Sequence, residues 1–175
     1  MTSPALYALA IGLLALERLA ELVVARRNAA WSFARGGLEV GAGHYPLMVL
    51  LHSGFLLAAP AEVLFLDRPA PAAWPLLLAL ALLCQGLRWW CITTLGPRWN
   101  TRVIIVPGLA PITHGPYRHL RHPNYLAVVT ELLVVPLLHG AWLTALVFSA
   151  LNAALLAHRI RVEEAALATL PGGPS

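Results

Sequence analysis

Charged residues are scarce in this sequence, and one charged residue type, Lys, is missing altogether. Only 11% of the 175 residues are charged, and the 12 basic side chains are all Arg, without a single Lys. A soluble domain carries about 25% charged residues, so this composition excludes an ordinary water-soluble globular protein. The arginines are scattered along the chain rather than gathered in one basic domain, which argues against nucleic acid as a partner.

Cysteine is also rare, with Cys84 and Cys91 as the two examples. They lie seven residues apart in one apolar segment, about two helical turns, so they share a helix face but are too distant to form a disulfide with each other. No His or Cys spacing typical of a metal site occurs. We therefore expect two core cysteines, no disulfide framework and no metal.

Apolar residues are abundant, because they make up 59% of the chain. They form five segments, at residues 4–25, 45–66, 74–95, 125–138 and 141–157. About 20 apolar residues suffice for a helix to cross a bilayer. The pattern predicts an all-α integral membrane protein, a single domain over residues 1–175 with about five transmembrane helices.

The ends and the connections add detail to this prediction. The first segment lacks a preceding basic region and a convincing cleavage site, so we expect a retained helix rather than a signal peptide. Only two residues separate segments 125–138 and 141–157, which predicts a short helical hairpin. Residues 158–167 should continue as a polar tail helix, and 171–175 should form a frayed end. The β-branched run 103–106 predicts a small extended piece.

The arginines also predict an orientation. Under the five-segment model nine of them fall on one side, namely Arg26, Arg27, Arg35, Arg98, Arg102, Arg118, Arg121, Arg159 and Arg161. Arg68 falls on the other side. Since basic loops stay in the cytoplasm, we expect the N-terminus outside and the C-terminus inside. The long polar stretch 96–124 and the tail helix then share the cytoplasmic face.

Several ionisable residues fall inside the predicted helices, where an unpaired charge is costly. They are Glu17, Arg18, Glu21, His52, Arg88 and Glu131. Glu17, Arg18, Glu21 and Arg88 lie at similar depth, and either an ion-pair network between helices or a substrate site explains them equally well. Glu131 likewise has two equal explanations, because it could line a substrate cavity or form a hydrogen bond between helices.

The stretch from His114 to Tyr125, with the sequence HGPYRHLRHPNY, gathers cationic side chains at the start of an apolar segment. Proline suits the first turn of a helix, so Pro123 should begin one, and helix N-termini favour anions. The two tyrosines, Tyr117 and Tyr125, can stack on a flat ring or act as interfacial anchors. These features predict a pocket for an anionic or carboxylate-bearing ligand.

A second polar element, Arg159 to Glu164, follows the predicted hairpin. Arg159 and Glu163 are four residues apart, so a surface ion pair is one explanation. Carboxylates also suit ribose hydroxyls or an ammonium group, and cations suit a carboxylate. S-adenosylmethionine presents all three groups, which makes it a candidate ligand for the two elements together.

The combination of Gly115–Tyr125, an apolar hairpin and then Arg159 with Glu163 and Glu164 resembles the isoprenylcysteine carboxyl methyltransferase family over roughly residues 85–168. The upstream part resembles a bacterial branch that O-methylates alkylpyrones or alkylresorcinols. The resemblance implies S-adenosylmethionine as methyl donor. It implies a cofactor site made of Tyr117, Arg118, Arg121, His122, Pro123, Tyr125, Arg159, Glu163 and Glu164.

The resemblance also divides the chain into an N-terminal substrate region, 1–84, and a cofactor-binding core, 85–168. A lipophilic acceptor would enter from the bilayer of a bacterial cell membrane. A phenolic acceptor would need a base or a cation beside it. The candidates are His52, Arg88, Arg102 and Glu131. Ala127 and Glu131 depart from the prenylcysteine enzymes and argue against a prenylated cysteine as acceptor.

The sequence is also compatible with other functions. A phospholipid N-methyltransferase or a thiol S-methyltransferase would use the same cofactor with another acceptor. A non-catalytic membrane scaffold or a small transporter would need no cofactor. The apolar surfaces also leave a homo-oligomer open, because they can face either lipid or a second copy.

Overall fold

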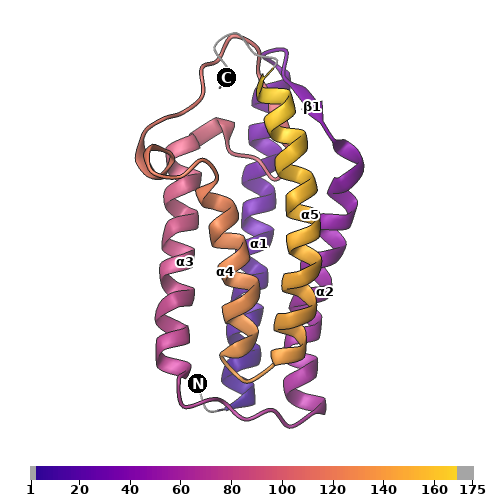
Figure 1. Cartoon of the computed structure of the whole chain (residues 1–175), viewed down its shortest axis with the longest axis vertical. Coiled ribbons are helices and arrows are strands. Elements are labelled where there is room, and N and C mark those ends of the chain that lie inside the picture. Colours follow the sequence, from indigo (N-terminus) through magenta and orange to yellow (C-terminus); the bar gives the residue numbers. More distant parts are fainter. Residues whose placement is uncertain (1–2, 169–175) are drawn as a thin grey trace.

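The protein is a bundle of five long helices with its polar loops gathered at one end, seen at the top of Figure 1. The computed structural model describes residues 3–168. The long helices are α1 (Pro4–Phe33), α2 (Tyr45–Phe65), α3 (Trp74–Leu95), α4 (Pro123–Leu137) and α5 (Trp142–Ala168). The expected frayed end at 171–175 lies outside the described residues.

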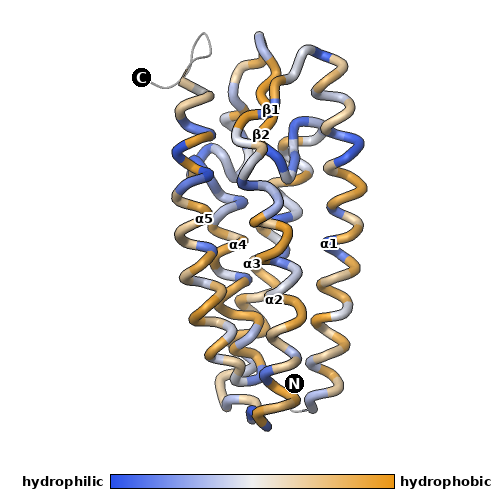
Figure 2. The backbone as a smooth tube through the Cα atoms, turned by 90° about the vertical axis from the view of Figure 1, so that its right-hand side faces the viewer, coloured by the Kyte–Doolittle hydropathy of each residue, from blue (hydrophilic) through white to orange (hydrophobic). Residues whose placement is uncertain are grey.

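Three stretches of the described chain are long and apolar enough to cross a membrane, namely Ala42–Phe65, Trp74–Arg98 and Trp142–Ala166. Helix α4 is a shorter apolar helix. Figure 2 shows that the middle parts of the helices are mostly hydrophobic and that the end that carries the loops is more hydrophilic. Large apolar side chains such as Leu50, Leu57 and Leu83 are at least 70% exposed. Such exposure fits contact with lipid, so the chain is a membrane protein with transmembrane helices.

Helix α1 is longer than the sequence predicted. The sequence predicts an apolar segment at 4–25 and a polar, Gly-rich loop at 28–44, but the helix continues to Phe33, so the prediction was wrong over residues 28–33. Asn28 explains part of this extension, because its amide donates to the backbone oxygens of Gly96 and Trp99 at 3.1 and 2.7 Å. Asn28, a residue type common in loops, is thus part of the helix and is hydrogen-bonded to the loop after α3.

The last two helices form the predicted hairpin. Gly140 turns the chain with φ +70°, and a Cβ atom there would lie 2.6 Å from the carbonyl oxygen of Pro69. Glu62 caps the start of α5, because its carboxylate accepts from the backbone N–H groups of Leu143 and Thr144 at 3.2 and 2.7 Å. The polar tail continues α5 without a break to Ala168, which confirms the predicted tail helix.

A two-stranded antiparallel sheet ties two loops together at the polar end. Strand β1 (Leu38–Val40) pairs with β2 (Val103–Ile105), with Glu39 opposite Ile104. The extended piece predicted at 103–106 is therefore confirmed, whereas β1 was not predicted. Three short 3₁₀ helices complete the connections, at Ala42–His44, Gly96–Arg98 and Gly115–Arg118.

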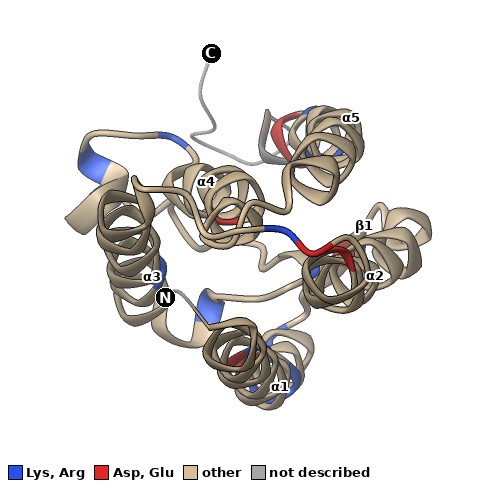
Figure 3. Cartoon of the chain, turned by 90° about the horizontal axis from the view of Figure 1, so that it is seen from below, with Lys and Arg blue, Asp and Glu red and all other residues tan. Residues whose placement is uncertain are grey.

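The charges inside the bundle form one network across α1, α3 and α4, which carry acidic and basic positions in Figure 3. Arg18 contacts Glu17, Glu21 and Glu131 at 3.3, 2.8 and 3.2 Å. Glu21 in turn accepts two hydrogen bonds from Arg88, at 2.6 and 2.7 Å. The structure thus places the intramembrane charges in an ion-pair network, with Glu131 bonded between helices.

This network generates a prediction about stability. Replacing Glu21 with Leu leaves the Arg88 guanidinium buried without its bidentate partner, which should cost about 3–5 kcal/mol of unfolding free energy. The double variant Glu21→Leu with Arg88→Leu removes both charges and should be much less destabilised. Denaturation of purified protein in mixed detergent micelles measures both values. A single variant no less stable than the double variant would contradict the network's role.

Candidate active site

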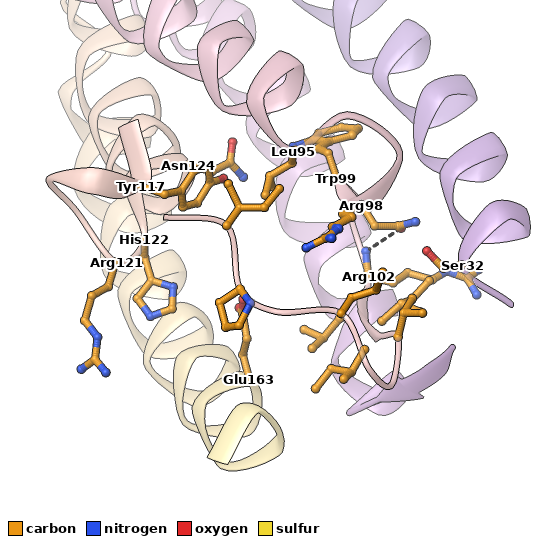
Figure 4. Close-up of a pocket in the computed structure, with 18 of the residues that line it drawn as sticks. Ser32, Leu95, Arg98, Trp99, Arg102, Tyr117, Arg121, His122, Asn124 and Glu163 are labelled. Atoms are coloured by element: carbon orange, nitrogen blue, oxygen red, sulfur yellow. Dashed lines mark hydrogen bonds between the residues drawn. The ribbon is translucent and has the colours of Figure 1, made fainter. Parts of the chain in front are cut away.

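A cavity of about 270 Å³ opens at the polar end of the bundle (Figure 4). Its walls come from the loop after α3, the 3₁₀ turn Gly115–Arg118, the first turn of α4 and the tail of α5. The predicted site residues among its lining are Arg102, Tyr117, Arg121, His122, Tyr125, Arg159 and Glu163. The structure therefore brings two segments that are far apart in the sequence to one cavity.

Local geometry positions the histidine–arginine turn. Gly115 has φ +59°, and a Cβ atom there would lie 2.7 Å from the Oγ1 atom of Thr94. A glycine is required at this point, because the turn packs directly on α3 and has a left-handed backbone. Pro123 then occupies the first turn of α4. The turn is thereby held between two helices with Tyr117 and His122 at the cavity.

Three side-chain contacts join this turn to the tail of α5. The Tyr125 hydroxyl donates to the Glu163 carboxylate and accepts from Arg159 Nε at 2.9 Å. His122 Nε2 lies 3.3 Å from Glu164 Oε1. The rings of His122 and Tyr125 stack with centroids 5.2 Å apart. The predicted meeting of the turn with the tandem glutamates is therefore observed.

Arg159 is the buried member of this group, with 5% of its surface exposed. Its guanidinium also donates to the Thr101 carbonyl at 2.8 Å and contacts the Met48 sulfur at 2.7 Å. The sequence allowed a surface ion pair between Arg159 and Glu163. In the structure Arg159 makes these buried contacts instead. Arg159 thus connects α5 to α2 and to the loop after α3.

A second, smaller cavity of about 60 Å³ lies among the helices beside the first. The side chains of His52, Asn152 and Arg88 contribute to its lining. Both cavities share the same five residues, namely Trp99, Asn100, Asn124, Tyr125 and Arg159. These residues form a partition between a polar chamber at the loops and a smaller chamber within the bundle.

Three residues of the partition, Trp99, Asn100 and Asn124, were not predicted as site residues. Trp99 is 2% exposed, and its indole N–H is buried without a hydrogen-bond partner among the described residues. The side-chain oxygen of Asn124 is buried and unpaired in the same way. Buried polar atoms normally have partners, so these two atoms point to ligand contacts. Figure 4 places both side chains at the same end of the large cavity, away from Glu163.

Some predicted site residues lie outside both linings. Arg118 is exposed, Pro123 is buried at the start of α4, and Glu164 reaches the site only through His122. Glu131 belongs to the ion-pair network through Arg18.

The other residues predicted to act as a base or a cation beside a phenolic acceptor lie in different cavities. His52 and Arg88 line the small one, and Arg102 lines the large one. Arg102 is also paired with Glu39 at 3.1 Å and lies over the Tyr45 ring, with its guanidinium carbon 4.9 Å from the ring centroid.

Tyr117 contributes a neutral hydroxyl to the large cavity. Burial raises the pKa of this hydroxyl well above its usual range, and the neighbouring Cys91 thiol and Glu163 carboxylate act in the same direction. The phenol therefore stays protonated at physiological pH and serves as a hydrogen-bond donor or acceptor rather than as an anion.

Comparison with known proteins adds a family to this geometry. The sequence profile of the isoprenylcysteine carboxyl methyltransferase (ICMT) family matches residues 77–169. The uncharacterized protein YpbQ of Bacillus subtilis (strain 168) is 40% identical over 159 residues, which cover 91% of this chain and 95% of that protein. An uncharacterized protein of Haemophilus influenzae is 27% identical over 154 residues, 87% of this chain and 90% of its own. No solved structure matches the chain significantly.

The central contact of the site predicts a change in dynamics. Tyr125→Phe removes the hydroxyl that bonds both Glu163 and Arg159, so the tail of α5 loses an anchor to α4. Backbone amides of residues 159–168 should then exchange with deuterium faster, by roughly tenfold for the loss of about 1.4 kcal/mol of local stability. Tyr7→Phe, a matched loss of a hydroxyl at the opposite end of the bundle, should leave these amides unchanged. Equal tail exchange in both variants would refute this anchor.

Proposed function

The chain belongs to the isoprenylcysteine carboxyl methyltransferase family, and from this premise we propose that it transfers a methyl group from S-adenosylmethionine to an oxygen atom of a lipophilic acceptor. Membership implies a membrane methyltransferase that uses this cofactor. The observation that carries the finer proposal is the pair of cavities that share one wall. The larger lies at the loops, where a soluble cofactor has access, and the smaller lies among apolar helices.

The large cavity fits the chemistry of the cofactor. Arg121 and the N-terminus of α4 offer positive charge to its carboxylate, and His122 offers a ring nitrogen. The Glu163 carboxylate, oriented by the Tyr125 hydroxyl, suits ribose hydroxyls or the ammonium group. The unpaired indole N–H of Trp99 and side-chain oxygen of Asn124 offer one further donor and one further acceptor. Bound there, S-adenosylmethionine supplies an electrophilic methyl group on a sulfonium centre.

The small cavity suits the reactive head of the acceptor. Arg88 and Arg159 both line it, and both are less than 10% exposed. Their charges favour an oxygen that is anionic or becomes so during the reaction. The same charges disfavour the protonated amine of a phospholipid, so they favour O-methylation over N-methylation. The apolar chain of the acceptor would remain among the helices and lipid.

We further propose that all five long helices cross or enter the bilayer, with the N-terminus outside. The distribution of arginines supports this topology, because the loops at the polar end hold most of them. The large cavity then opens to the cytoplasm of a bacterial cell. The acceptor class stays as the resemblance implies, an alkylpyrone, an alkylresorcinol or a prenylcysteine-like carboxylate.

The proposed cofactor site predicts binding defects. His122→Ala and Glu163→Gln each remove a polar partner of the ligand, so each should weaken S-adenosylmethionine binding by roughly tenfold to a hundredfold. Arg161→Gln, on the exposed face of the same tail helix, is the matched control and should bind normally. Equilibrium binding of labelled cofactor to purified protein measures the affinities.

Normal affinity in both site variants would defeat this assignment of residues. If the wild-type protein fails to bind the cofactor at all, the proposed function fails with it, and a scaffold or transporter becomes the better explanation. Labelled methyl transfer to a panel of prenylcysteines, alkylpyrones and alkylresorcinols then identifies the acceptor.

The proposed topology predicts which loops an impermeant thiol reagent reaches. Ala72→Cys and Thr113→Cys place thiols at exposed positions of opposite ends of the bundle, in a background where Cys84 and Cys91 are replaced by Ala. In intact cells only the thiol at position 72 should be labelled, and the thiol at position 113 should react after permeabilisation. The reverse pattern would contradict the orientation.

A further inference from the structure

The imidazole of His52 lies in the lining of the small cavity. We infer that His52 is a general base, which takes the proton from a neutral hydroxyl acceptor in this cavity. The inference rests on the proposed function and narrows it, because it selects a phenol or enol over a carboxylate as methyl acceptor.

The tautomer of His52 follows from its hydrogen bond to the backbone of α2. Its Nδ1 atom lies 2.9 Å from the carbonyl oxygen of Met48, one helical turn earlier on α2. A carbonyl oxygen only accepts hydrogen bonds, so Nδ1 must carry the hydrogen. In the neutral ring Nε2 then holds a lone pair. Since His52 lines the small cavity, that lone pair is available to a hydroxyl placed there.

The carboxylates nearest this part of the bundle are engaged elsewhere. Glu131 is held by Arg18 at 3.2 Å, and Glu21 by Arg88 in a bidentate pair. Both carboxylates thus serve the ion-pair network rather than the small cavity, whose lining includes neither of them. His52 is therefore the group in that lining with a free basic lone pair.

The groups that face His52 suit the oxygen that remains after the proton leaves. The charged neighbours are Arg18 from α1, Arg88 from α3 and Arg159 from α5, and α4 contributes the Tyr125 hydroxyl. Arg88 and Arg159, which line the cavity, place positive charge beside an oxyanion formed there.

The proposed step balances in atoms and charge. The acceptor hydroxyl gives its proton to His52 Nε2, and its oxygen forms a new bond to the methyl carbon. The carbon–sulfur bond breaks with its electron pair remaining on sulfur, which converts a sulfonium to a neutral thioether. The imidazolium later releases its proton to water, and no oxidant or reductant is required.

A carboxylate acceptor fits this arrangement less well. At neutral pH it has no proton to give, so a base contributes nothing to its methylation. It would also turn an oxygen lone pair toward the lone pair of Nε2, which is repulsive. A phenolic hydroxyl, with a reference pKa of about 10, needs such a base.

Two substitutions at His52 separate basicity from hydrogen bonding. His52→Gln keeps a side-chain oxygen that accepts from a hydroxyl but is not a base, and His52→Leu removes both properties. The acceptors are a 5-alkylresorcinol, which is neutral at pH 7, and an acidic alkyl hydroxypyrone of equal chain length, which is already ionised. Rates are measured from pH 5 to 9 with labelled S-adenosylmethionine.

We expect His52→Gln to lower kcat on the resorcinol by roughly a hundredfold or more, the contribution typical of general-base catalysis. Its rate on the ionised hydroxypyrone should stay within about threefold of wild type. In the wild type, the rate on the resorcinol should rise with pH as one group loses a proton. That limb of the profile should vanish in His52→Gln.

Binding to the cofactor-free protein gives a readout independent of turnover. Wild type and His52→Gln should bind the resorcinol more tightly than its dimethyl ether, which has no hydroxyl to donate. His52→Leu should lose this preference. Equal rate losses on both acceptors, an unchanged pH profile in His52→Gln, or no preference for the hydroxyl in wild type would each overturn the base assignment.

Cofactor affinity, measured in parallel, keeps this inference separate from the proposed function. Normal S-adenosylmethionine binding in every His52 variant, together with any of those three results, would reject the base alone. Absence of cofactor binding in the wild type would reject the proposed function itself, and the base assignment with it.

Discussion

The contact of the Tyr125 hydroxyl with Glu163 and Arg159 holds the functional end of this protein together. It joins the first turn of α4 to the last turns of α5, although a whole membrane hairpin separates them in the chain. The same three residues line the large cavity, and two of them, Tyr125 and Arg159, also line the small one. One interaction therefore both closes the site and divides it into two chambers.

The bilayer imposes the second constraint. Charged groups within apolar helices must be paired, and the network around Arg18 and Glu21 meets this requirement across α1, α3 and α4. Its effect extends beyond stability, since Arg88 is fixed by Glu21 while it lines the small cavity. A structural ion pair thereby presents positive charge to the place where we propose the acceptor oxygen lies.

Sequence patterns were most informative where a feature is local. The bounds of α3 agree residue for residue with the apolar segment predicted at 74–95. The motif from His114 to Tyr125 and the tandem glutamates were singled out from their chemistry, and their contact is observed. Their roles toward a cofactor remain predictions.

What the sequence did not reveal depends on contacts between distant segments. The extension of α1 beyond Asn28 relies on two carbonyls in the loop after α3, and β1 exists only because β2 pairs with it. Trp99 and Asn124 gave no signal of their own, since an unpaired buried atom is visible only once the surrounding fold is known.

The most direct test of this account is a crystal structure of the protein with S-adenosylhomocysteine in a lipidic phase. We expect the ligand in the large cavity between Tyr117, His122 and Glu163, with its sulfur directed toward the partition formed by Trp99, Tyr125 and Arg159. Ligand density at the opposite end of the bundle, or with its sulfur turned away from the small cavity, would contradict the two-chamber site.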